Sequence, residues 1–142
     1  MSAIDDLTEL QQAIFNYMWT QSNDFKTLCV GGFHHDEYAK DKEEQYPNTQ
    51  YFFVSFIYDR DSCSKYAEAI IQFRFVHNDK DVTKINKLIA EFDSRFSDCE
   101  DSLVLPNFKI HDVRSINVRP PRKTVANRFE ASRDYKMIIN RK

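Results

Sequence analysis

Glycine is scarce in this 142-residue chain, which contains only Gly31 and Gly32. Loops that wrap a phosphate group use several glycines, because glycine adopts their backbone angles without strain. Neither the Walker phosphate-loop pattern nor the dinucleotide-binding glycine pattern is present. The sequence therefore argues against a nucleotide-binding enzyme of either kind.

Cysteine and long hydrophobic runs are also scarce. The three cysteines, Cys29, Cys63 and Cys99, are an odd number without paired spacing, so we expect free thiols in a reducing compartment and no disulfide framework. No cationic start followed by an apolar run indicates a signal peptide. No apolar run approaches the roughly 18 residues that a membrane-spanning helix needs. We therefore expect a protein that is made and used in a cytoplasm, without a membrane partner.

Motifs for catalysis or metal binding are missing as well. Residues 34–37 read His-His-Asp-Glu, but adjacent side chains diverge on a strand or a helix. A metal site there would need distant ligands such as His77 or His111, and no zinc spacing is present. No serine lies in a nucleophile-elbow motif. The prediction is a chain that is not an enzyme, with no catalytic residues, cofactor or metal.

The chain does contain a strong division of charge. Residues 113–142 hold nine Lys and Arg against two Asp and Glu, a net charge of +7. Residues 1–112 hold eleven Lys and Arg against twenty Asp and Glu, a net charge of −9. The total charge of −2 therefore hides two oppositely charged parts. Such asymmetry points to a partner that recognises charge. That partner is either nucleic acid or the acidic part of another copy of the chain.

Hydrophobic periodicity predicts two amphipathic helices and at least four strands. The first helix should begin at a capping box on Asp6 and end near Ser22. An aspartate cluster should open the second helix. Residues 28–32 could be a short strand or a turn, and residues 39–50 read as an exposed loop. The second helix is predicted at Asp79–Phe96. The four strands are predicted at Tyr51–Tyr58, Ala69–Val76, Phe108–Val118 and Phe129–Ile139, and a bulge is expected in the third of them near Val113.

The strand Tyr51–Tyr58 is apolar on both faces, which predicts a central strand that is covered on both sides. Two helices can cover only one face of a sheet. The other face must meet a curled part of the sheet or another subunit, so the strand gives physical support for an oligomer.

The element order, α-β-β-β-α-β-β, segregates helices from strands. It predicts an α+β fold over a single domain, residues 1–142. We expect a mostly antiparallel sheet of four to five strands with two helices packed on one face.

Residues 119–128 form a basic, proline-containing segment that we expect to be a loop or arm, because two prolines cannot continue a central strand. We predict that its cations, Arg119, Arg122, Lys123 and Arg128, contact another subunit or a partner. The charged loop that contains Lys40, Glu43 and Glu44 is a possible acceptor. Nucleic acid is the alternative ligand for the same cations.

The layout resembles the tail terminator, or tail completion, proteins of long-tailed bacteriophages, including the tail-to-head joining type. The resemblance covers roughly residues 5–140. It rests on the element order, on Pro47 followed by the strand Tyr51–Val54, and on the final strand with its motif Arg128–Tyr135. The low glycine content and the basic segment 119–128 depart from the family pattern.

The resemblance implies a structural virion protein of the tail or neck, assembled in the cytoplasm of a bacterial host. Proteins of this family form a ring, often hexameric, that ends polymerisation of the tail tube. The implied partners are other copies of the chain, the tail tube protein and the head-tail connector or stopper protein, with DNA only as cargo passing through the lumen.

Overall fold

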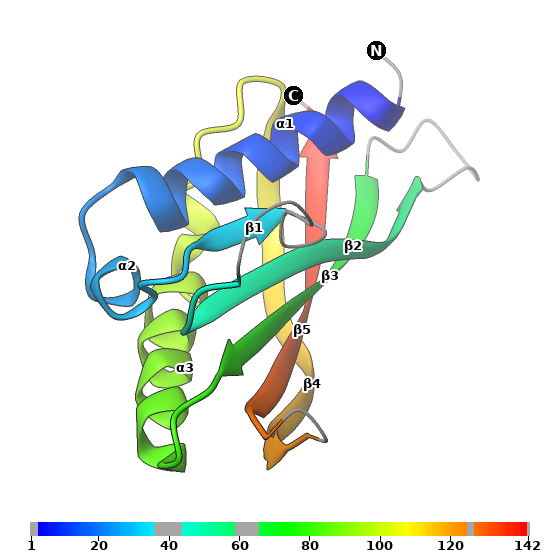
Figure 1. The fold of residues 1–142 in the computed structure, drawn as a ribbon. Helices are drawn as coiled ribbons and strands as arrows, with labels where there is room; N and C mark the ends of the chain where they lie inside the picture. The colour runs from blue at the N-terminus through cyan, green and yellow to red at the C-terminus, as the bar shows by residue number, and fades with distance from the viewer. Residues whose placement is uncertain (1–2, 36–43, 59–65, 125–126, 142) are drawn as a thin grey trace.

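The fold combines helices with one five-stranded sheet, which confirms the predicted α+β class (Figure 1). The computed structural model describes residues 3–35, 44–58, 66–124 and 127–141. The helical elements are α1 (Ala3–Phe15), its π-helical extension η1 (Asn16–Thr20), α2 (Asp24–Leu28), α3 (Val82–Phe96) and the short 3-10 turn η2 (Cys99–Asp101). The strands are β1 (Phe33–His35), β2 (Asn48–Tyr58), β3 (Tyr66–His77), β4 (Phe108–Lys123) and β5 (Phe129–Arg141).

The strands lie in the order β1-β2-β3-β5-β4, so β3 is the middle strand and β4 is an edge. All neighbouring strands are antiparallel except β1 and β2, which run parallel. In Figure 1, α1, α2 and α3 lie on the same side of the sheet. The mostly antiparallel sheet and the one-sided helical layer are therefore confirmed, although the described residues form three α-helices where two were predicted.

The core lies between the sheet and the helices. On β3, Ala67, Ala69, Ile71, Phe73 and Phe75 alternate toward the helices, and none is more than 2% exposed. From α3, the rings of Phe92 and Phe96 lie 4.6 and 4.8 Å from that of Phe73. Aromatic pairs at these distances add to the stabilisation from buried area.

An aspartate opens the second helix, as the sequence predicts, but α3 begins at Val82 and not at Asp79. The Asp81 carboxylate accepts a hydrogen bond from the Thr83 backbone N–H at 2.9 Å, which satisfies one of the free donors at the start of α3. The apolar residues that recur at helical spacing along α3 are all buried, namely Ile85, Leu88, Ile89, Phe92 and Phe96.

The two glycines make a tight turn before β1. The Gly31 N–H donates to the Pro47 carbonyl at 2.6 Å, and a Cβ on Gly31 would lie 2.2 Å from the Gln45 carbonyl oxygen. Gly32 has φ +102°, a conformation that other residues rarely adopt. Residues 28–32 are thus a helix end and a turn, and the strand begins at Phe33.

The starts of the first helix and of β2 differ from the prediction. The first helix begins at Ala3, ahead of the predicted cap at Asp6. The predicted loop 39–50 gives way to β2 at Asn48, whose side chain is buried and donates to the Glu44 carboxylate and the Gln45 carbonyl. Polar residues can start a buried strand when their hydrogen bonds are satisfied in this way. Of the predicted loop, residues 39–43 lie outside the described residues.

The strand predicted to be central, Tyr51–Tyr58, instead lies second from the edge, as part of β2. Its helix-facing side is buried at Tyr51, but Val54 and Ile57 are 57% and 60% exposed. Among the described residues, no helix covers the opposite face of the sheet. One side of the run therefore meets the core, whereas the predicted cover on the other side is absent from the described residues of a single chain.

β4 continues through the double proline, so residues 119–123 of the predicted loop or arm belong to an edge strand, and Thr124 and Arg128 lie beyond its end. Proline is tolerated there because an edge strand has one side without ladder hydrogen bonds. The pairing with β5 shifts register three times, between Ile110 and Asp112, Ser115 and Asn117, and Arg119 and Arg122. The first shift confirms the bulge expected near Val113.

Candidate interaction site

The face of the sheet away from the helices carries two neighbouring rows of mostly polar side chains at its basic end. Strand pairing aligns Gln50, Arg74, Ser132 and Arg119 in one row across β2, β3, β5 and β4. The next row contains Asn48, Val76, Glu130 and Arg122. We call this side of the sheet the outer face.

The bulge at the double proline places two arginines on this face together. Alternation along a regular strand would send side chains three positions apart, such as Arg119 and Arg122, to opposite faces. The extra residue between them restores a common direction, because both pair with outer-face residues of β5, Ser132 and Glu130. The prolines thus concentrate the charge on one face of the edge strand.

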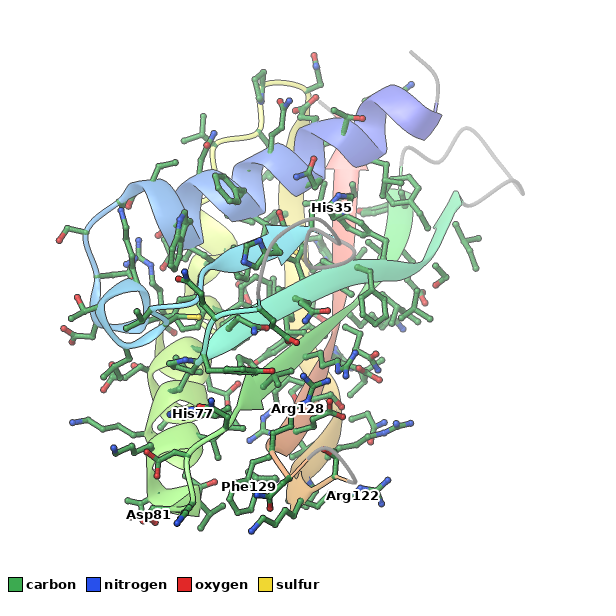
Figure 2. The ribbon with its side chains drawn as sticks, in the orientation of Figure 1. His35, His77, Asp81, Arg122, Arg128 and Phe129 are labelled. Atoms are coloured by element: carbon green, nitrogen blue, oxygen red, sulfur yellow. The ribbon has the colours of Figure 1, made fainter. Side chains whose placement is uncertain are left out.

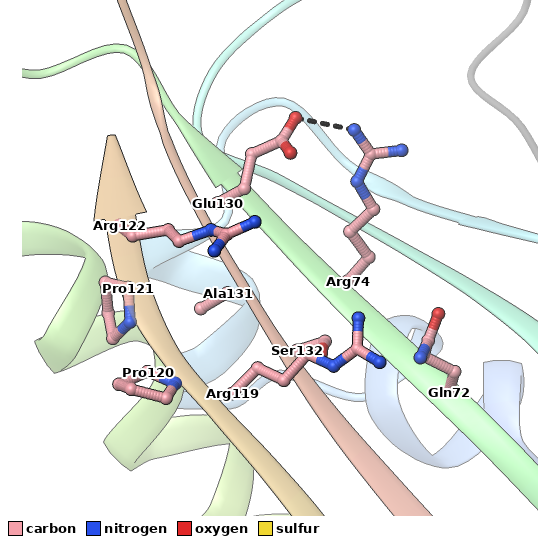
Figure 3. Close-up of a pocket in the computed structure, with 9 residues that line it drawn as sticks. All are labelled: Gln72, Arg74, Arg119, Pro120, Pro121, Arg122, Glu130, Ala131 and Ser132. Atoms are coloured by element: carbon pink, nitrogen blue, oxygen red, sulfur yellow. Dashed lines mark hydrogen bonds and ion pairs between the residues drawn. The ribbon is translucent and has the colours of Figure 1, made fainter. Parts of the chain in front are cut away.

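A hollow of about 450 Å³ lies between these rows (Figure 3). Its polar lining includes three guanidinium groups, of Arg74, Arg119 and Arg122, and one carboxylate, of Glu130. Arg74 donates to Glu130 at 2.5 Å. Arg119 and Arg122 are exposed, and no carboxylate among the described residues lies within ion-pair distance of either. The hollow therefore has an excess of positive charge that its own residues do not neutralise.

Arg128 is held differently from the other cations. It donates to the Glu44 carboxylate at 2.8 Å and to the Tyr46 hydroxyl at 2.9 Å, and it lies 3.3 Å from Glu130. Its side chain is 22% exposed. Arg128 therefore fastens the β4–β5 turn to the segment that precedes β2, within one copy of the chain.

The pKa of Glu44 reflects this contact. Burial alone raises the pKa, but hydrogen bonds from Asn48 and Arg128, with the charge of Arg128, outweigh burial and hold it below its ordinary value of 4.5. Glu44 is thus ionised and already paired at neutral pH.

The predicted contact residues fall into separate groups in the structure. Arg119 and Arg122 lie together at the hollow, whereas Lys123 pairs with Phe129 on the helix side, its Nζ 5.9 Å from the ring centroid. Arg128 and Glu44 contact each other. Lys40 and Glu43 lie outside the described residues. Figure 2 shows Arg122, Arg128 and Phe129 near the same end of the sheet.

Sequence reasoning did not assign Arg74 or Glu130 to the site. Arg74 lies on the face of β3 opposite the buried aromatic residues, so the alternation of apolar and polar residues along the strand predicts which face Arg74 occupies. The strand that lies beside β3 cannot be predicted from this pattern. It follows only from the order of the strands in the sheet, in which β5 separates β3 from β4.

A second charged feature lies at the opposite end of β4. The turn after α3 presents Asp98, Glu100 and Asp101, all exposed and without an ion-pair partner among the described residues. Glu100 lines a small hollow with Phe108 and Lys109, at the start of β4. The basic residues stand at the other end of the same strand, so the acidic turn marks one end of β4 and the arginine-lined hollow marks the other. Figure 1 shows β4 running the length of the sheet between them.

The described thiols are poorly suited to nucleophilic chemistry. Cys29 and Cys99 are free and buried. Burial raises the pKa of Cys29 to about 11 and that of Cys99 to about 12. A thiol is nucleophilic as a thiolate, and both groups are protonated at neutral pH.

Within the described residues, no group of three or more His, Cys, Asp or Glu side chains is placed to hold a metal ion. The same part of the chain has no helix that is both long and apolar enough to cross a membrane.

Comparison with known proteins identifies the fold but no sequence family. No family model matches the chain, and no curated protein sequence matches it. A chain of the solved structure described as "Virion of native gene transfer agent (GTA) particle" matches with a TM-score of 0.73. The match covers 95% of this chain and 97% of that chain, at 10% sequence identity. The two proteins share a fold over nearly their whole lengths.

Proposed function

We propose that this chain is a structural, non-enzymatic protein of a phage-like virion that forms a ring on the end of the tail tube. The observation that carries the proposal is the fold shared over nearly all of both chains with a component of a gene transfer agent virion. The element order that resembles phage tail terminators points in the same direction.

Two features of the chain support self-assembly. The outer face exposes large apolar side chains, including Ile57 at 60% exposure and Tyr66 at 40%, and apolar surface that gathers on one face favours a protein contact. The acidic and basic ends provide two different, complementary surfaces. A ring needs such a pair, because each subunit must present one patch to the neighbour on either side.

In this role the ring ends tube polymerisation and offers a surface to the head-tail connector. The partners are further copies of the chain, the tail tube protein and the connector or stopper protein. DNA passes through the lumen as cargo, and assembly takes place in the cytoplasm of a bacterial host. A hexamer is the proposed ring.

Mass photometry and negative-stain electron microscopy of the purified chain, alone and with tail tube protein, test the proposal. We expect closed rings, alone at high concentration or on the ends of tubes, and shorter tubes when the chain is present during polymerisation. A chain that stays monomeric and leaves tube length unchanged contradicts the ring function.

The unneutralised arginines at the hollow favour a second candidate, a nucleic-acid-binding module. Cations that contact phosphates make affinity fall linearly with salt on a log–log plot. Fluorescence anisotropy with duplex and single-stranded DNA, across a salt series, tests this function. Arg122→Ala with Lys123→Ala should flatten the slope if the alternative is right, and no binding at low salt contradicts it.

A further inference from the structure

We propose that the arginine-lined hollow at the basic end of one subunit receives the acidic turn, residues 98–101, of the next copy. The inference rests on the self-assembly in the proposed function and deepens it, because it names the two surfaces that meet. The contact is head-to-tail, since the two surfaces differ from each other and lie at opposite ends of β4.

The hollow has the chemistry to hold carboxylates. Guanidinium groups bind carboxylates through two parallel hydrogen bonds, and Arg119 and Arg122 have no such partner in the described part of their own chain. Figure 3 shows these two side chains extending from β4 over the β5 residues Glu130–Ser132. Glu130 is already bonded to Arg74, so it leaves the charge of the other two arginines available.

The acidic turn has the complementary properties. Asp98, Glu100 and Asp101 are exposed, and Cys99 between them is buried and fixes the turn against the body of the protein. The Ser102 and Leu103 N–H groups both donate to the Cys99 carbonyl, which holds the backbone of the turn. A fixed turn presents its charges without a large loss of conformational entropy on binding.

The two surfaces cannot meet within one subunit. Glu100 lies beside Phe108 and Lys109 at the start of β4, and the hollow lies beside Arg119 and Arg122 near its end. A strand rises about 3.3 Å per residue, so the two sites are separated by on the order of 35 Å. Each must find its opposite on another molecule, and repetition of that contact produces a ring or a filament.

The lining of the hollow favours a protein partner over nucleic acid. Surfaces that bind single strands usually combine cations with aromatic rings on which bases stack. The lining residues described here include no aromatic side chain, and Glu130 places a negative charge among the arginines. Carboxylates from a short turn match a few discrete guanidinium groups better than a continuous phosphate backbone does.

Charge-reversal variants test the contact by mass photometry and analytical ultracentrifugation, with and without tail tube protein. Arg119→Glu with Arg122→Glu reverses the hollow, and Glu100→Lys with Asp101→Lys reverses the turn. Each variant alone should self-associate at least about tenfold more weakly than the wild type, because like charges then face each other. Mixed in equal amounts, the two variants should recover assembly, since each supplies the surface that the other needs.

The matched control is Lys80→Glu with Lys87→Glu, which changes the net charge as much as the hollow variant does at exposed positions before and on α3. It should assemble like the wild type, and circular dichroism should show all variants folded. Rings that tolerate both reversals, or variants that stay apart when mixed, overturn the docking contact while leaving the ring function intact. A wild-type chain that never associates, even with tubes, overturns both. DNA binding that depends on Arg119 and Arg122, with assembly unaffected, overturns the inference in favour of nucleic acid.

Discussion

Arg133 shows how a cation is accommodated on the helix-facing side of the sheet. Its Nε donates to the Asp93 carboxylate on α3 at 3.1 Å, and the Tyr135 hydroxyl donates to the other oxygen at 2.8 Å. The side chain is 15% exposed, so its charge is partly desolvated and needs this partner. The alternation of β5 marks Arg133 as the exception on an apolar face, but nothing local names a carboxylate forty positions away as its partner.

Gly31 should be the glycine that tolerates substitution least. A methyl group at this position would overlap the Gln45 carbonyl oxygen, which is backbone and cannot rotate away. We expect Gly31→Ala to lower the free energy of unfolding by about 2 kcal/mol or more, in the range of overpacked sites. Urea denaturation measures this.

The control for this substitution is Val30→Ala at a side chain that is 71% exposed, which should change stability by less than about 0.5 kcal/mol. Equal stabilities for the two variants would mean that the glycine turn is not packed as described.

The buried thiols should react only after unfolding. Because the pKa of Cys29 is about 11 and that of Cys99 about 12, both are protonated near pH 8, and both side chains are 0% exposed. In a Cys63→Ser background, we expect a disulfide reagent to label neither thiol in buffer and both in denaturant. Absorbance of the released thiolate counts the labelled groups. Rapid labelling in buffer would contradict the burial of these residues.

Among the elements, the attachment of the β4–β5 turn to β2 should depend on pH. The Glu44 pKa is lowered in the folded protein, so its bonds to Asn48 and Arg128 stabilise the fold above pH 4.5, its ordinary pKa. This contribution is lost as the pH falls through the lowered native pKa.

The matched variant is Glu44→Gln, which cannot ionise. Urea denaturation at about pH 6 and about pH 3 should show a smaller loss of stability in Glu44→Gln than in the wild type. Equal losses in the two proteins would assign the acid sensitivity to other carboxylates.

The elements that the sequence predicts well are those with a complete local pattern. Buried and less buried residues alternate along β3 and β5, and apolar residues recur at helical spacing along α3. In each element the buried face is the one that the sequence pattern predicts. The order of the strands and the position of β2 could not be predicted in this way, because pairing depends on contacts between distant segments. The short strand considered at residues 28–32 lies instead at Phe33–His35, because three residues are too short for a periodic signal that would place them.

The candidate site was predictable in part for the same reason. Arg119 and Arg122 were found from the charge pattern, which is local. Their common direction depends on a bulge, and the contribution of Arg74 depends on the sheet order. The ion pair between Arg128 and Glu44 joins residues 84 positions apart, so the sequence around either residue does not predict it.

For the whole molecule, the open sheet face should matter for assembly more than for folding. Ile57 pairs with Glu68, and Glu68 pairs with Ile138, so the two isoleucines lie in one row on the outer face. At 60% exposure, Ile57 contributes little to the monomer core. We expect Ile57→Glu to weaken self-association about tenfold, while the monomer's free energy of unfolding changes by less than about 0.5 kcal/mol.

Sedimentation equilibrium and urea denaturation measure these two effects separately. A useful comparison is Val104→Glu, at a side chain that is 79% exposed in the segment that precedes β4. If both variants assemble like the wild type, the outer face near Ile57 is not a subunit contact.

The irregular pairing of β4 has a consequence for how this fold can change over evolution. β4 has 16 residues where β5 has 13, and the three register shifts absorb the difference. β5, in contrast, pairs with β3 through twelve successive positions without a shift. Single-residue insertions and deletions in homologues should therefore accumulate in β4, where each one also redirects the cations beyond it, while the length of β5 stays fixed.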